Sequence, residues 1–134
     1  DVDIIKEFNN YDAPIFIPNE GKIVKETEWL GSEVPAYWQT YDHQDFKLIG
    51  FGQLLENDTI PPDRFVLAFY DDVDDAMYDN PWDYSINPNQ SFIDDASVLI
   101  YFNPVEIPAG ESRTVQTYYG LDQMYFTYLP LIMK

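Results

Sequence analysis

Residues 65–70 of the chain read FVLAFY, and residues 98–102 read VLIYF. Each run is apolar throughout, rich in aromatic and branched residues, and as long as a single strand. A strand with water on one face alternates apolar and polar side chains, whereas a strand covered on both faces can be apolar at every position. We therefore expect both runs to be central strands with both faces covered.

Short segments of strand composition, separated by turns rich in Asn, Asp, Gly and Pro, lie on both sides of these two runs. Seven or eight strands at this spacing predict an all-β fold, an antiparallel β-sandwich of Ig-like or jelly-roll type. The chain has 134 residues and shows no linker-like segment, so we expect one domain over residues 1–134. The further predicted strands are residues 2–8, 15–18, 22–29, 46–55, 112–119 and 124–133.

Little helix is expected in this chain. The nearest candidate is the segment from Asp71 to Tyr84, which is crowded with carboxylates and contains Pro81. Proline breaks a helix interior, and aspartate is a poor helix former. We expect at most one helical turn there.

The composition excludes several function classes. The formal charge is −17, from 24 acidic against 7 basic residues, which disfavours nucleic acid or an anionic membrane surface as a partner. No stretch is apolar for long enough to span a membrane. The chain has no cysteine and a single histidine, His43, so disulfides, thiolate sites and multi-histidine metal sites are impossible. No nucleophile motif is present, and we expect a protein that is not an enzyme.

Aspartate is concentrated in two segments, and together these predict a calcium site. Ca²⁺ takes about six to eight oxygen ligands, and it would offset the repulsion within so acidic a chain. If the strands that precede and follow these segments are antiparallel neighbours, both segments lie at one end of the sandwich. The alternative is a solvated acidic loop. The candidate ligands are Asp71, Asp72, Asp74, Asp75, Asp79, Asp83, Asp94 and Asp95.

Two alternative functions would involve glycans. Trp38 and Trp82 could stack on sugar rings in a carbohydrate-binding module, or they could fill the ends of the sandwich. In a glycan-active hydrolase, Asp94 or Asp95 would pair with an acid of the other segment. Asn57 and Asn89 each begin an Asn-x-Ser/Thr pattern in a predicted loop and are candidate glycosylation sites.

The second half of the chain carries a family resemblance. Residues 107–115, IPAGESRTV, resemble a turn-and-strand signature of Ig-like modules in bacterial and archaeal surface proteins. The resemblance extends over residues 94–121, through Asn103-Pro104 and the closing segment Tyr118-Tyr119-Gly120-Leu121. It implies a β-sandwich module of large extracellular, S-layer-like proteins with a structural or adhesive role, and it supplies no catalytic residues. Residues 1–93 show no family motif.

The expected function is an extracellular module that builds or decorates a cell-surface assembly or filament. Its expected partners are copies of itself or another surface protein, with glycans as the alternative. Strand exchange is one route, because an open sandwich edge accepts an added strand. The apolar run 124–129 is the predicted exchange strand, and the alternative is that it is the last strand of the same domain. The chain begins at Asp1 and not at Met, which we take to fit a processed secreted protein or a piece of a longer one.

Overall fold

The computed structural model describes residues 15–41, 48–56, 59–79, 83–92 and 95–123. Within these ranges eight strands form two antiparallel sheets, which confirms the predicted all-β sandwich. The strand orders are β2-β1-β4-β5-β8 and β3-β6-β7. The elements are β1 (Ile15–Ile17), β2 (Gly21–Ile23), β3 (Thr27–Leu30), a 3-10 turn (Gly31–Glu33), β4 (Tyr37–Tyr41), β5 (Leu48–Gln53), β6 (Arg64–Phe69), α1 (Tyr70–Asp79), β7 (Ala96–Tyr101) and β8 (Tyr118–Gln123).

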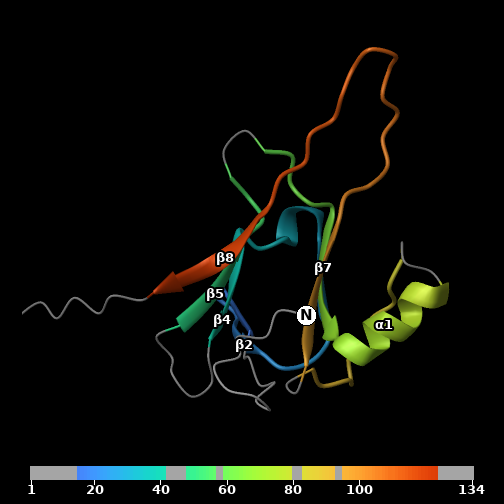
Figure 1. The fold of residues 1–134 in the computed structure, drawn as a ribbon. Coiled ribbons are helices and arrows are strands. Elements are labelled where there is room, and N and C mark those ends of the chain that lie inside the picture. Colours follow the sequence, from blue (N-terminus) through green and yellow to red (C-terminus); the bar gives the residue numbers. More distant parts are fainter. Residues whose placement is uncertain (1–14, 42–47, 57–58, 80–82, 93–94, 124–134) are drawn as a thin grey trace, which may run out of the picture.

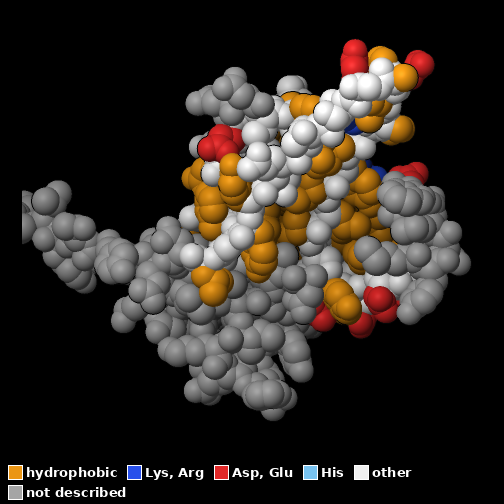
Figure 2. Space-filling view, turned by 45° about the horizontal axis from the view of Figure 1, so that its top comes forward, with side chains coloured by type: hydrophobic (Ala, Val, Ile, Leu, Met, Phe, Trp, Pro, Cys, Tyr) orange, Lys and Arg blue, Asp and Glu red, His pale blue; other side chains and the backbone are white. Residues whose placement is uncertain are grey.

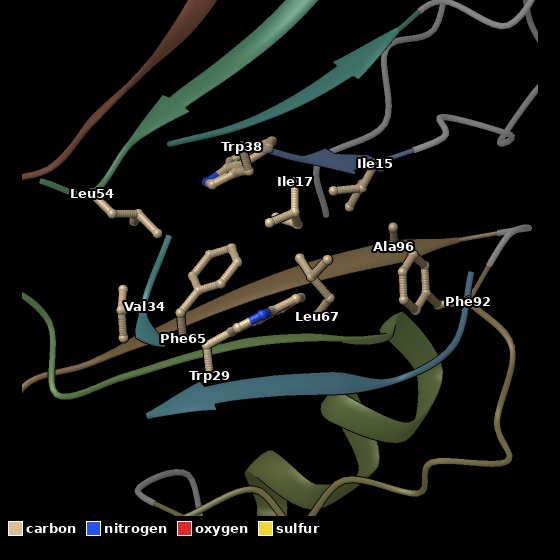
Figure 3. Close-up of a cluster of buried hydrophobic side chains, with 10 residues drawn as sticks. All are labelled: Ile15, Ile17, Trp29, Val34, Trp38, Leu54, Phe65, Leu67, Phe92 and Ala96. Atoms are coloured by element: carbon tan, nitrogen blue, oxygen red, sulfur yellow. The ribbon is translucent and has the colours of Figure 1, made fainter. Parts of the chain in front are cut away.

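The molecule has three layers (Figure 1). The five-stranded sheet faces one side of the three-stranded sheet, and α1 lies on the other side. Figure 3 shows side chains of the two sheets pointing toward one another between the layers. This main core consists of Ile15, Ile17, Trp29, Val34, Trp38, Leu54, Phe65, Leu67, Phe92 and Ala96. A second cluster, under α1, consists of Val66, Ala68, Val73 and Tyr84.

Strand β6 contributes alternate residues to both clusters. Phe65 and Leu67 lie in the main core, whereas Val66 and Ala68 lie in the cluster under α1. All four side chains are fully buried. The expectation that residues 65–70 form a central strand covered on both faces is therefore confirmed for β6, which lies between β3 and β7.

The expectation of a central position is wrong for the second apolar run. β7 is covered on both faces, because Val98 and Ile100 pack on the main core while Leu99 and Tyr101 pack on the cluster under α1. It nevertheless pairs with β6 alone among the described strands and is an edge strand. Its continuous apolar sequence reflects the two covered faces and not a neighbour on each side.

Three strand predictions also need correction. The predicted strand 22–29 is two strands, β2 and β3, which belong to different sheets. In place of a strand over 112–119, residues 103–117 protrude from the sandwich and pairing begins only at Tyr118 (Figure 1). β4 was not predicted at all. The predicted strands 2–8 and 124–133 lie outside the described residues.

The segment that follows β6 is a helix of ten residues, not a single turn. Pro81 does not interrupt this helix, because the helix ends at Asp79. Asp71 and Asp72 occupy its first turn, where a negative charge interacts favourably with the helix dipole. Val73 and Ala76, three residues apart, share the face that packs on the three-stranded sheet. Packing and end charges thus outweigh the poor helix propensity of aspartate.

A row of three residues crosses the five-stranded sheet on its core side. Trp38 of β4 pairs with Gly52 of β5, which pairs with Tyr119 of β8. The rings of Trp38 and Tyr119 stack with centroids 5.5 Å apart. A Cβ at Gly52 would overlap the indole of Trp38, so the glycine lets the tryptophan lie flat on the sheet.

Replacing Gly52 with alanine should therefore destabilise the fold. The indole must move, and overpacking of this kind costs about 1–3 kcal/mol. Gly120→Ala is the matched control, because a Cβ at Gly120 meets nothing within 4 Å and should change the free energy of unfolding by less than about 0.5 kcal/mol. Urea denaturation of both variants measures the difference, and equal effects would contradict the placement of Trp38.

Candidate functional site

An open groove lies between α1 and the segment 83–87. Its volume is about 400 Å³. Three carboxylates face it, from Asp72 and Asp75 on the helix and from Asp83 on the segment opposite. The remaining lining residues are Ala76, Tyr84, Ser85 and Asn87.

A buried carboxylate, Glu26, stands behind this groove. Its side chain is 2% exposed and lies in the connection between β2 and β3. Oε1 accepts hydrogen bonds from the Tyr84 hydroxyl at 2.7 Å and from the backbone N–H of Phe69 at 2.9 Å, and Oε2 accepts one from the N–H of Asn87 at 2.6 Å. One carboxylate thus ties the end of β6 to the segment that forms one wall of the groove.

Arg64 holds the same segment from the other end of β6. Its Nη2 donates a hydrogen bond to the Tyr84 carbonyl at 2.5 Å, and its Nη1 lies 3.2 Å from Asp83 Oδ1. Its Nε donates to Glu28 Oε2 at 2.7 Å, and the guanidinium stacks 5.0 Å from the ring centroid of Tyr101. Segment 83–87 has no regular secondary structure, so these two charged side chains fix its position.

The environment of the groove favours the neutral form of one of its acids, Asp72. Burial, followed by the charges of Glu26, Asp75 and Asp71, raises the pKa of Asp72 above 3.8. A raised pKa in the folded state means that the ionised Asp72 opposes folding at neutral pH, and that this penalty is relieved as the pH falls through the folded pKa. Burial, and then the hydrogen bond to Glu26, also raises the pKa of Tyr84, which keeps its hydroxyl proton.

Glu26→Ala should destabilise the protein strongly, because it leaves two backbone N–H groups and a buried hydroxyl without their acceptor. We expect a loss of roughly 3–5 kcal/mol in the free energy of unfolding. Glu28→Ala, two residues along, is the control: Glu28 is part-exposed and should cost about 1 kcal/mol or less. Denaturation of both variants provides the comparison, and similar losses would show that Glu26 is not a structural anchor.

The structure places the predicted metal ligands as follows. β6 and β7 are antiparallel neighbours, so the premise that brought the two acidic segments to one end is confirmed. Asp95 lies at the start of α1, where its carbonyl accepts a hydrogen bond from the N–H of Tyr70 at 3.1 Å. Asp94 lies outside the described residues, as does the side chain of Asp79. The exposed side chains are those of Asp71, Asp74, Asp75 and Asp83.

Among the described residues, no group of three or more acidic or histidine side chains is arranged to hold one metal ion. The helical conformation of the aspartate-rich segment explains why these side chains do not converge. Successive residues of a helix point in directions about 100° apart, so a run of aspartates spreads around the axis and does not converge on one point.

The predicted sugar-binding and glycosylation residues have different environments. Trp38 is 2% exposed and part of the main core, so the prediction that its ring is a platform for sugars is wrong and the alternative, that it fills the sandwich, holds. Trp82 and Asn57 lie outside the described residues. Asn89 is exposed in a turn closed by a hydrogen bond from Gln90 N–H to the Asn87 carbonyl, 2.8 Å long, where a glycan would meet no core contact.

A second candidate site is the core-facing side of β8, which sequence reasoning did not single out as a surface. Tyr119 is on this side because it stacks on Trp38, and Leu121 shares it because alternate residues of a strand point the same way. The two side chains are nevertheless 59% and 66% exposed. Figure 3 shows no labelled core side chain from β8, which lies beyond the cluster. We call the exposed side chains of Tyr119 and Leu121 on this side of β8 the uncovered face.

The chain that leads to the uncovered face is exposed as well. In Figure 2 hydrophobic side chains are visible at the surface along the chain that runs from β8 to the protruding segment. Among the described residues, most of the large hydrophobic side chains that are exposed come from this stretch: Val105, Ile107, Val115, Tyr118, Tyr119 and Leu121. This concentration of exposed apolar side chains makes the stretch a candidate interaction surface.

In the part of the chain that the structure describes, no helix has the length and apolar character needed to cross a membrane. Comparison of the chain with protein-family models, with curated proteins and with solved structures found no match.

Proposed function

We propose that the chain is an extracellular structural or adhesive module that builds or decorates a cell-surface assembly, S-layer-like or filamentous, by binding copies of itself. The observation that carries this proposal is the uncovered face. Leu121 and Tyr119 are on the side of the five-stranded sheet whose other strands contribute to the main core, yet these two side chains are mostly exposed. A second molecule would complete their burial.

The energetic gain from covering this face is substantial. Full burial of one large apolar side chain contributes about 1.5–3 kcal/mol, and every 1.4 kcal/mol changes an affinity tenfold. Tyr119 is preorganised for contact, since its ring is already stacked on Trp38. The free molecule therefore loses little side-chain entropy on binding, which favours association.

Two further features support a cell-surface location within this proposal. The stretch 94–121 resembles surface-protein modules, and it contains the exposed apolar residues described above. Asn89 of the Asn-Gln-Ser pattern is exposed in a turn, as a glycan acceptor must be. A strongly acidic surface also keeps such a protein soluble before it assembles.

Calcium is the cation that we propose to stabilise the module. Support comes from the charge of −17 and from the repulsion among the acidic side chains that line the groove, which a nearby cation would reduce although the described side chains do not form one coordination site. Calcium at about 100 times its dissociation constant adds roughly 2.7 kcal/mol, or several degrees in melting temperature. Sodium chloride at equal ionic strength is the control, and Asp72→Asn should reduce the gain. Melting curves that coincide with calcium and with chelator would contradict this part of the proposal.

The assembly proposal predicts that Leu121→Thr weakens self-association, because it removes apolar area from the uncovered face while keeping a strand-forming residue. We expect a dissociation constant at least about tenfold higher by analytical ultracentrifugation of the full chain. Leu30→Thr is the matched control, since Leu30 is also a strand leucine, 53% exposed, but lies on β3. A wild-type chain that stays monomeric at every concentration, or equal effects of the two substitutions, would overturn the proposal.

A further inference from the structure

The two sheets are of unequal width, and the difference falls on one side of the sandwich. Only residues 24–26 separate β2 from β3, so these two strands lie at the same side, one in each sheet. Counting from that side among the described strands, β4 and β7 are each third, and the five-stranded sheet continues through β5 and β8 whereas the three-stranded sheet ends at β7. A further strand beside β7 would therefore lie opposite β5, next to the uncovered face, because Tyr119 of β8 reaches across Gly52 of β5 to stack on Trp38.

The outer edge of β7 has backbone groups directed away from β6. The carbonyls of Asp95 and Tyr101 both accept hydrogen bonds from the β6 side, from Tyr70 and Asp63 respectively. Backbone groups alternate in direction along an antiparallel strand, so those of Val98 and Ile100 point to the opposite edge. No strand among the described residues pairs with that edge. An apolar edge strand of this kind is a template for an added strand.

Two buried polar atoms border the same region. Trp38 Nε1 and Thr40 Oγ1 are buried and have no hydrogen-bond partner within the described part of the chain. The indole nitrogen lies over Gly52, that is, on the side of the tryptophan nearer to β8. Buried donors without partners cost about 1–3 kcal/mol, which an acceptor brought in by another strand would remove.

We propose that the position beside β7, opposite β5 and next to the uncovered face of β8, is filled by a β-strand from a second copy of the chain, antiparallel to β7. This inference rests on the proposed function and names its mode of assembly. The added strand hydrogen-bonds to Val98 and Ile100, and its alternate side chains cover Tyr119 and Leu121. The three-stranded sheet becomes four-stranded, and the main core extends past β5 to the side chains that reach inward from β8.

The charge of the chain and the direction of its strands favour a second copy as the source of the added strand. A chain with net charge −17 repels acidic segments, whereas its residues 123–134 contain no Asp or Glu and are apolar except for Gln123, Thr127 and Lys134. β7 runs toward the protruding segment and β8 runs away from it (Figure 1). A strand that turned straight back after β8 would therefore run parallel to β7, whereas all described strand pairs are antiparallel. A second copy can supply the antiparallel direction.

The absence of native cysteine makes a crosslinking test possible in the full chain. Ile100→Cys is mixed with a second variant that carries Tyr125→Cys, Thr127→Cys or Leu129→Cys, three alternate positions that allow for shifts of register. A short bismaleimide then joins cysteines that lie close together. We expect crosslinked dimers of the two variants, at least tenfold more abundant than with Leu30→Cys on β3, the opposite edge of the sheet. If Ile100→Cys fails to fold, Val98→Cys replaces it.

The other outcomes decide against the inference in distinguishable ways. If self-association persists but none of the mixed pairs crosslinks above the Leu30→Cys control, strand addition at β7 is wrong and the proposed function stands. If the double variant Ile100→Cys with Thr127→Cys crosslinks only within one chain, the strand comes from the same molecule and the second copy is excluded. If sedimentation shows no association, the proposed function fails with the inference.

Discussion

No face of β6 can be exposed to water. Phe65 and Leu67 point one way, Val66 and Ala68 the other, and all four are fully buried, so the three-stranded sheet must be covered on both sides. The five-stranded sheet covers one side, and α1 with Tyr84 covers the other. The same requirement extends to β7, whose faces are covered but whose outer edge has no neighbour among the described strands. The double coverage of β6 thus determines the three layers, and among the described strands it leaves the position beside β7 without a strand.

Polar anchoring of the outer layer depends on Glu26. Its carboxylate accepts hydrogen bonds from Phe69, Tyr84 and Asn87, which belong to the end of β6 and to the segment that packs over it. A buried charge is tolerated only when its oxygens are well paired, and here three donors pair them. The acidic groove is a consequence of this arrangement, since the anchored segment lies against a helix that carries aspartates in its first two turns.

The sandwich and its doubly covered strand could be predicted from the sequence, because a continuous apolar run such as residues 65–70 is typical of a strand with both faces covered. The edge position of β7 could not be predicted from the sequence, since an apolar run looks the same whether or not another strand pairs with its outer edge. The helix at Tyr70–Asp79 was missed because packing of Val73 on the sheet is a tertiary effect. Glu26 carried no signal, because a single acid in a predicted strand is more often on the surface. The uncovered face depends on how far one sheet extends past the other, which no local pattern records.

Amide hydrogen exchange along β7 distinguishes a free outer edge from one paired with an added strand, because it reports on each backbone N–H in turn. The Leu121→Thr variant, at a concentration at which sedimentation shows it to be monomeric, and the assembled wild-type chain are compared residue by residue. Leu99 and Tyr101 face β6 and should be protected in both. Val98 and Ile100 face the outer edge, so their amides should exchange fast in the monomer and at least tenfold more slowly in the assembly. Equal exchange of these two amides in both states would contradict strand addition at β7.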